Sequence, residues 1–125
     1  MNEGDTFTLV DVADHHLWVI ISDPVIDDQN VLFVNFTSWD SYEDQTVILD
    51  VCDHPFIKHR TCVAYSRARV SADVALQRLA TANRLALHDP ASDDLLKKLR
   101  DGAVASNRTK NEHLQLLVNQ GIVDL

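Results

Sequence analysis

Several residue types are scarce in this chain. Among its 125 residues are two cysteines, three glycines and three prolines, and the first 53 residues contain no lysine or arginine. Two cysteines are too few for a disulfide scaffold. No segment approaches the run of about 18 apolar residues that spans a membrane, and the amino terminus is acidic where a signal peptide would be basic. We therefore expect a cytoplasmic protein with reduced thiols and no membrane contact.

Charge is distributed unevenly along the chain. Nineteen acidic residues against eleven basic ones give a formal net charge of -8. Twelve of the carboxylates precede residue 54, whereas residues 54 to 70 contain no carboxylate and four cations, Lys58, Arg60, Arg67 and Arg69. General attraction for polyanions would need the opposite net charge, so the cationic segment predicts a local binding site.

The apolar pattern predicts an α+β domain. Segments rich in Val, Ile, Phe, Trp and Thr between turn-forming residues predict five short strands, at residues 6–12, 17–22, 31–36, 46–51 and 61–65. After residue 70 the spacing becomes helical, with Ser71, Ser92 and Thr109 as capping residues for two or three helices. We expect one domain over residues 1–125, a small antiparallel barrel at 1–70 with a helical extension at 71–125. Residues 85–91 are a candidate hinge.

The first strands resemble those of a known family. Gly4-Asp5 precedes the first predicted strand, the second begins at His16 in HLWVIIS, and Thr37-Ser38 follows the third. These short motifs, within residues 3 to 70, resemble the MazF/PemK-like toxins of bacterial toxin–antitoxin pairs. The resemblance implies an SH3-like barrel, usually a homodimer, that cleaves single-stranded RNA without a metal or other cofactor. It also implies a cognate antitoxin protein as partner.

The resemblance also implies site residues. In such ribonucleases an Arg just before the second strand and a Thr after the third serve the phosphodiester chemistry. By position the Thr is Thr37, with Ser38 beside it, whereas the Arg position holds His15 or His16. Arg is a permanent cation and His is one only when protonated, so this is a departure from the family. A His there can instead act as general acid or base, and we predict His16 as the proton-transfer residue.

The cationic segment supplies the remaining candidates. Metal-free RNA cleavage requires a base for the 2′-hydroxyl, an acid for the leaving oxygen and a cation near the non-bridging oxygens. His59 or His54 would transfer protons in this segment, and we predict His59 as a catalytic residue with His16 and Thr37. In an extended segment Lys58 and Arg60 would face away from His59, so all three line one pocket only if the segment is a loop. Aromatic side chains beside cations indicate base stacking. The predicted substrate-binding residues are His15, Ser38, Trp39, His54, Phe56, Lys58, Arg60 and Arg67.

Other interpretations stay open for the same residues. The cations can form a solvated rim or pair with nearby carboxylates, and histidines or hydroxyls at strand ends are common in turns. Cys52, His54, His59 and Cys62 are zinc-type ligands, although their spacing matches no zinc motif. The apolar stripe of the helices predicts packing on the barrel, or a surface for a second copy or an antitoxin segment. The alternative function is a non-catalytic SH3-like module that binds a protein or nucleic acid.

Overall fold

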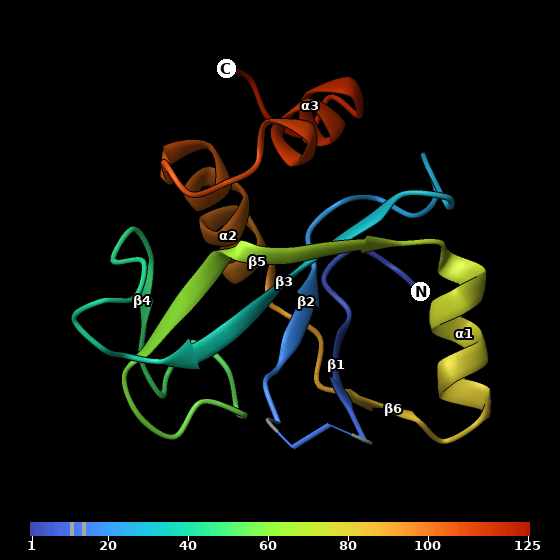
Figure 1. Cartoon of the computed structure of the whole chain (residues 1–125), viewed down its shortest axis with the longest axis horizontal. Helices are drawn as coiled ribbons and strands as arrows, with labels where there is room; N and C mark the ends of the chain where they lie inside the picture. The colour runs from blue at the N-terminus through green and yellow to red at the C-terminus, as the bar shows by residue number, and fades with distance from the viewer. Residues whose placement is uncertain (11, 14) are drawn as a thin grey trace.

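The computed structural model describes residues 1–10, 12–13 and 15–125. Over these residues the chain forms six strands and three helices (Figure 1). The strands are β1 (Thr6–Leu9), β2 (Trp18–Ile20), β3 (Val31–Ser38), β4 (Ile48–Leu49), β5 (Thr61–Ser71) and β6 (Leu85–His88). The helices are α1 (Asp73–Thr81), α2 (Asp93–Ala105) and α3 (Asn111–Asn119). The α+β class is therefore confirmed, with three helices.

All six strands belong to one antiparallel sheet in the order β4-β5-β3-β2-β1-β6. Within the described residues the edge strands β4 and β6 do not pair with each other, so the sheet is open. The structure contains the short antiparallel strands that we expected, but the sheet does not close into a barrel. In the described part of the chain, no helix is long and apolar enough to cross a membrane.

The observed strands differ from the predicted ones in length. The first ends at Leu9 rather than at residue 12. Two residues near its end, Asp11 and Asp14, lie outside the described residues. The fourth strand contains only two residues, whereas the fifth continues to Ser71, six residues beyond the predicted end at residue 65. The continuous apolar run ends at Tyr65 and is followed by Ser66 and Arg67, which is why the sequence pattern ended the strand too early.

Residues 85–88, which we expected in a hinge, form β6 instead. This strand pairs along its whole length with β1, from Thr6 opposite His88 to Leu9 opposite Leu85. The part of the chain expected to be wholly helical thus contributes an edge strand of the sheet. Four residues give too short a pattern to identify a strand, so only the pairing with β1 reveals it.

Of the three capping residues predicted from the sequence, one caps its helix in the structure. The Ser92 hydroxyl accepts a hydrogen bond from the Leu95 amide at 3.1 Å, as predicted for α2. By contrast, α1 begins after Ala72 rather than Ser71, and α3 begins after Lys110, without side-chain caps. The predicted capping box from Thr109 is therefore wrong. Packing of the helices on the sheet compensates for the missing caps.

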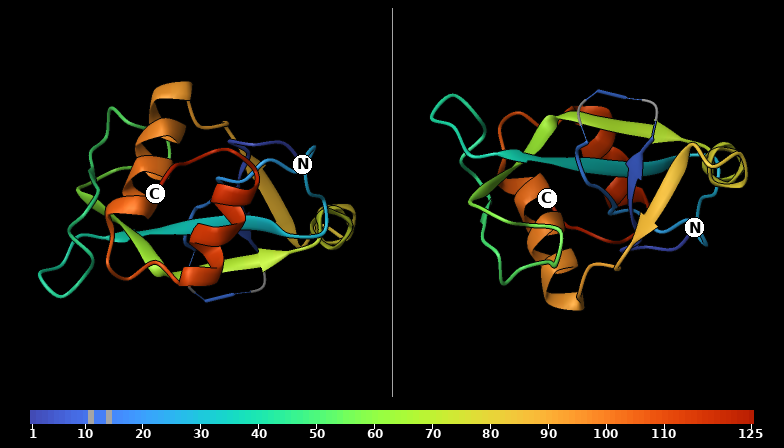
Figure 2. Two further views of the ribbon diagram at one scale, coloured as in Figure 1. Left: turned by 90° about the horizontal axis from the view of Figure 1, so that it is seen from above. Right: turned by 90° about the horizontal axis from the view of Figure 1, so that it is seen from below.

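The sheet has a hydrophobic cluster on each face. Strand β2 shows why, because its alternating residues enter different clusters: Val19 faces α2 and α3, whereas Trp18 and Ile20 face α1 and β6. Figure 2 shows α2 and α3 lying across one face of the sheet, with α1 beyond the end of β5. The first cluster includes Leu99 of α2 and Leu117 of α3, both fully buried.

Helix α2 approaches the sheet most closely at Gly102. There a methyl group would overlap the hydroxyl of Tyr65 and the side chain of Val47. The Tyr65 hydroxyl donates a hydrogen bond of 2.7 Å to the Leu99 carbonyl, and burial raises the pKa of this phenol. Gly102 is thus required by packing, although it lowers the intrinsic stability of the helix.

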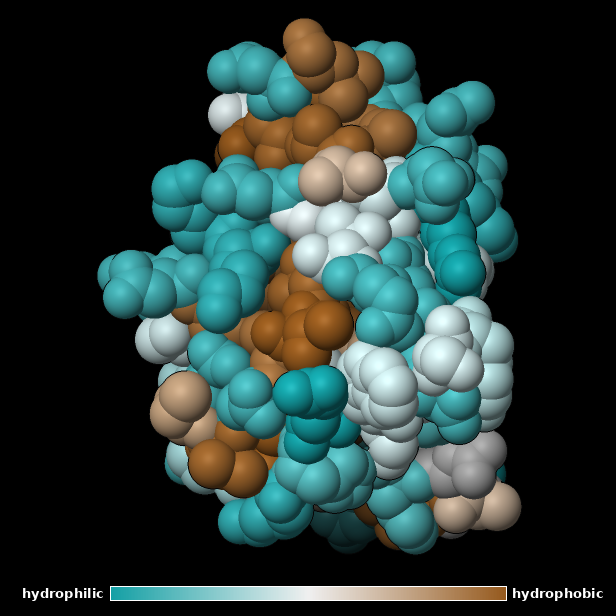
Figure 3. Space-filling model, turned by 90° about the vertical axis from the view of Figure 1, so that its left-hand side faces the viewer, coloured by the Kyte–Doolittle hydropathy of each residue, from teal (hydrophilic) through white to brown (hydrophobic). Residues whose placement is uncertain are grey.

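The side of the molecule that carries β4 has a mixed surface. Figure 3 shows hydrophilic side chains there, interrupted by separate hydrophobic areas. Exposed apolar residues of this region include Ile48 and Val51. Scattered apolar residues of this kind are normal on a protein surface.

Candidate functional site

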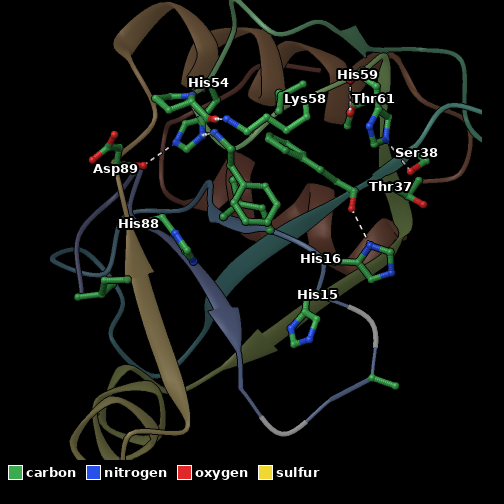
Figure 4. Close-up of a pocket in the computed structure, with 17 residues that line it drawn as sticks. His15, His16, Thr37, Ser38, His54, Lys58, His59, Thr61, His88 and Asp89 are labelled. Atoms are coloured by element: carbon green, nitrogen blue, oxygen red, sulfur yellow. Dashed lines mark hydrogen bonds between the residues drawn. The ribbon is translucent and has the colours of Figure 1, made fainter.

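A large open pocket lies where four loops and strand ends meet (Figure 4). Its cavity volume is about 1070 Å³, and it is lined by residues 13, 15–17, 36–38, 54–59, 61 and 87–89. Five of the six histidines of the chain line it, namely His15, His16, His54, His59 and His88. Apolar side chains, among them Leu17, Phe36, Phe56 and Leu87, line the space between them.

The structure brings together eight of the eleven predicted site residues. All three predicted catalytic residues, His16, Thr37 and His59, line the pocket although they come from different parts of the chain. Five of the predicted substrate-binding residues also line it: His15, Ser38, His54, Phe56 and Lys58. Trp39, Arg60 and Arg67 do not. Their roles stay predictions, but the convergence required for a common site is present.

The imidazole of His16 is oriented by the backbone of β3. Its Nδ1 lies 2.9 Å from the Phe36 carbonyl oxygen. A carbonyl can only accept, so Nδ1 carries the hydrogen and the lone pair of the neutral ring is on Nε2. Within the described residues Nε2 has no hydrogen-bond partner. His16 therefore offers a fixed ring with one free nitrogen, which suits a proton acceptor. His15, by comparison, is exposed.

A serine and a histidine form a pair in the lining of the pocket (Figure 4). The Oγ of Ser38 lies 2.8 Å from Nε2 of His59, and both residues are exposed. The Thr61 hydroxyl donates to the His59 carbonyl at 2.9 Å, which holds the end of this loop. Thr37 precedes Ser38 at the end of β3 and is half-buried in the same wall. An imidazole thus lies beside two hydroxyls on an accessible surface.

His54 has a different environment from the other pocket histidines. Its Nδ1 accepts a hydrogen bond from the Phe56 amide at 3.0 Å, so Nδ1 carries no hydrogen. Its Nε2 therefore donates to the Asp89 carbonyl at 2.6 Å, and the side chain is 4% exposed. Because both ring nitrogens are used, His54 is a positioning residue that ties the 54–57 turn to the segment after β6.

Further contacts surround the 54–57 turn at the edge of the pocket. The Lys58 ammonium donates to the Pro55 carbonyl at 2.9 Å, which holds the cation close to the pocket. The rings of Phe56 and His88 meet edge to face, with centroids 5.2 Å apart. His88 also shares a hydrogen bond of 2.9 Å with the Thr8 hydroxyl. Sequence reasoning missed His88, because the only signal for it is membership of β6.

The three predicted residues outside the pocket have partners elsewhere. The guanidinium of Arg60 lies 5.7 Å from the ring centroid of Trp39, whose Nε1 donates to the Gln45 side chain at 2.7 Å. This cation–π contact covers one face of the indole. Arg67 forms an ion pair of 3.1 Å with Glu43. Residues 50–60 are a loop, as a shared pocket requires, but Arg60 does not line the pocket with Lys58 and His59.

The zinc-type residues of the segment do not converge. Among the described residues, no three His, Cys, Asp or Glu side chains lie close enough together to hold a metal ion. Cys62 is fully buried in β5, and burial raises the pKa of its thiol, whereas Cys52 is exposed. Cys62 is therefore a core residue, which agrees with its place in an apolar run.

Comparison with known proteins found no family model and no curated protein that matches this chain. The resemblance to MazF/PemK-like toxins therefore depends on the short motifs of the sequence, and the function depends on the geometry of the pocket.

Proposed function

We propose that this chain is a metal-independent endoribonuclease of the MazF/PemK type that acts on single-stranded RNA. One observation supports this above all: His16, Thr37 and His59, chosen from sequence alone, line the same pocket. The proposal includes the finer features of the family, an SH3-like barrel, a homodimer, a cytoplasmic location and neutralisation by an antitoxin. The open antiparallel sheet of short strands is compatible with such a barrel.

The chemistry needs two proton transfers. The 2′-hydroxyl of the RNA attacks the adjacent phosphorus and gives its proton to Nε2 of neutral His16. As the bond from phosphorus to the 5′-oxygen breaks, protonated His59 gives a proton to that oxygen. The products are a 2′,3′-cyclic phosphate and a 5′-hydroxyl, with one proton gained and one lost by the protein. The hydrogen bond with Ser38 orients the acid, and that with Phe36 orients the base.

Charge on the phosphorane is stabilised by groups at the rim. The Thr37 hydroxyl and the Lys58 ammonium both line the pocket and can donate to the non-bridging oxygens. Phe56 provides an apolar surface for a base beside them. A fixed cation thus comes from Lys58 in the 54–61 loop, which offsets the absence of Arg before β2. His15, exposed at the pocket edge, adds positive charge whenever it is protonated.

Expression in bacteria without a partner tests the function in cells. We expect growth arrest by the parent, relieved by His16→Ala and by Thr37→Ala. Thr81→Ala is the matched control, because Thr81 is an exposed threonine at the end of α1, outside the pocket residues. Arrest that persists in both pocket variants would refute the assignment.

Purified protein tests the chemistry directly. The parent should cut single-stranded RNA in the presence of a chelator and leave 2′,3′-cyclic phosphate ends. His16→Gln and His59→Gln should each lower the rate about 10²- to 10⁴-fold, which is the usual contribution of a general acid or base. Tight RNA binding without any cleavage by the parent would instead support the non-catalytic module.

A further inference from the structure

The pocket continues into a second hollow along β5. The two share Ala13, His16 and Thr37 as lining residues, and the second has a cavity volume of about 780 Å³. His16 and Thr37, two of the residues proposed to act on the phosphodiester, therefore lie at the junction of the two hollows. A strand of RNA that places its scissile phosphate at this junction extends into the second hollow with a neighbouring nucleotide.

An irregularity of β5 places cations in this hollow. Phe33 pairs with Arg69 and Asn35 pairs with Ala64, so residues 65–68 of β5 face a single residue of β3. Such bulges redirect side chains and are common beside functional sites. Here the bulge leaves Arg67 and Arg69 exposed along the hollow.

The cations of the hollow differ in how they are paired. Arg67 is held by Glu43, the one carboxylate among the described residues that line the hollow. Arg69 lies over the ring of Trp18 at 5.1 Å, and Lys110, at the start of α3, is exposed. Within the described part of the chain neither Arg69 nor Lys110 forms an ion pair. Among the described residues, these two cations have no carboxylate partner and can therefore contact phosphate.

Asn35 supplies a second, independent indication of a ligand. Its side chain is 3% exposed and lines the hollow, and its Oδ1 has no hydrogen-bond donor among the described residues. A buried acceptor without a partner is unfavourable, so few persist in folded proteins. Asn35 is two residues from Thr37 on the same face of β3, a separation of about 7 Å along the strand. The amide therefore lies next to the proposed phosphate site.

We propose that the second hollow binds the nucleotide adjacent to the scissile phosphate. The Oδ1 of Asn35 is buried in the structure, so the side chain must turn toward the hollow before Oδ1 accepts a hydrogen bond from an amino or imino group of the base. Arg69 and Lys110 contact the phosphate of the same nucleotide. This subsite rests on the proposed function for the choice of RNA as ligand, and it adds a source of base preference. Phosphate contacts set affinity, and the contact to the base edge sets specificity.

Binding of an uncleavable RNA tests the two cations. The probe is a fluorescent single-stranded 2′-O-methyl oligonucleotide, with affinity measured by anisotropy over a range of salt concentrations. Arg69→Ala and Lys110→Ala should each weaken binding and reduce the slope of log affinity against log salt by about 0.7, the value for one phosphate contact on a single strand. Lys97→Ala is the matched control, because Lys97 is exposed on α2 and pairs with Asp101. A parent that does not bind, or slopes unchanged in both variants, would overturn the subsite.

Asn35→Leu tests the contact to the base. This variant keeps the approximate side-chain volume and removes the acceptor. It should reduce the differences in affinity among oligonucleotides of the four bases while leaving the salt slope unchanged. Identical base preference in the parent and in this variant would overturn the role of Asn35.

These measurements separate the subsite from catalysis because the probe cannot be cleaved. If the slopes fall but the parent does not cut RNA, the subsite stands and the proposed chemistry fails. If the parent cuts RNA and the slopes do not change, the chemistry stands and the subsite fails.

Discussion

Replacing His54 should cost stability rather than remove a catalytic group. The imidazole makes two hydrogen bonds to the backbone, at 3.0 Å from the Phe56 amide and at 2.6 Å to the Asp89 carbonyl. Each contributes about 0.5–1.5 kcal/mol, and loss of a buried ring leaves a cavity. His54→Ala should therefore lower the free energy of unfolding by about 2–4 kcal/mol.

Urea denaturation followed by circular dichroism measures this loss of stability. Two conservative variants separate the contributions of the two hydrogen bonds. His54→Asn keeps an acceptor near the position of Nδ1 for the Phe56 amide, and His54→Gln keeps a donor near the position of Nε2 for Asp89. Each should recover part of the stability lost in His54→Ala. A His54→Ala variant that is as stable as the parent but does not cleave RNA would refute the structural role.

Three further outcomes follow from the packing of α2 and from a buried carboxylate. Gly102→Ala should lower the free energy of unfolding by about 1–3 kcal/mol through overlap with Tyr65, and a more stable variant in urea denaturation would contradict this. Ser106→Ala should lower the free energy of unfolding by about 1.5–3 kcal/mol at pH 7, because the Ser106 hydroxyl donates a hydrogen bond of 2.5 Å to the Asp44 carboxylate. An unchanged midpoint of urea denaturation would contradict this expectation. Burial would raise the pKa of Asp44, but hydrogen bonds from Ser106 and Thr46 outweigh burial and hold this pKa below the ordinary value of 3.8. The stabilisation that these hydrogen bonds give is therefore present above pH 3.8. It is lost as the pH falls through the lowered pKa of Asp44 in the folded protein. The difference in the free energy of unfolding between the parent and Ser106→Ala should accordingly become smaller in strong acid. A difference that does not change with pH would argue against the link between Asp44 protonation and stability.

Most strands and helices were predictable because their periodicity is local. The apolar runs around Trp18 and Phe33 and the helical spacing around Leu99 are visible in the sequence and lie in the core as expected. Strand β6 was not predictable, because four residues carry little pattern and their pairing with β1 joins segments about eighty positions apart. Open or closed geometry of the sheet likewise depends on long-range pairing.

The site was predictable in its residue types but not in its side-chain directions. Sequence placed His16, Thr37 and His59 at strand ends or in a loop, and the structure brings them to one pocket. It did not show that Arg60 lies over Trp39, because loop torsions decide where such side chains point. Nor did it show that a backbone carbonyl thirty-five positions away uses one ring nitrogen of His54.

The dependence of kcat/KM on pH tests the central claim most directly, because the two imidazoles must be in opposite protonation states. For RNA cleavage by the parent we predict a bell-shaped profile, because the base must be neutral while the acid is protonated. His16→Gln should remove the acidic limb, where the rate rises as the base loses its proton, and His59→Gln should remove the alkaline limb. A parent profile without limbs, or limbs that persist in both variants, would contradict catalysis by this pair.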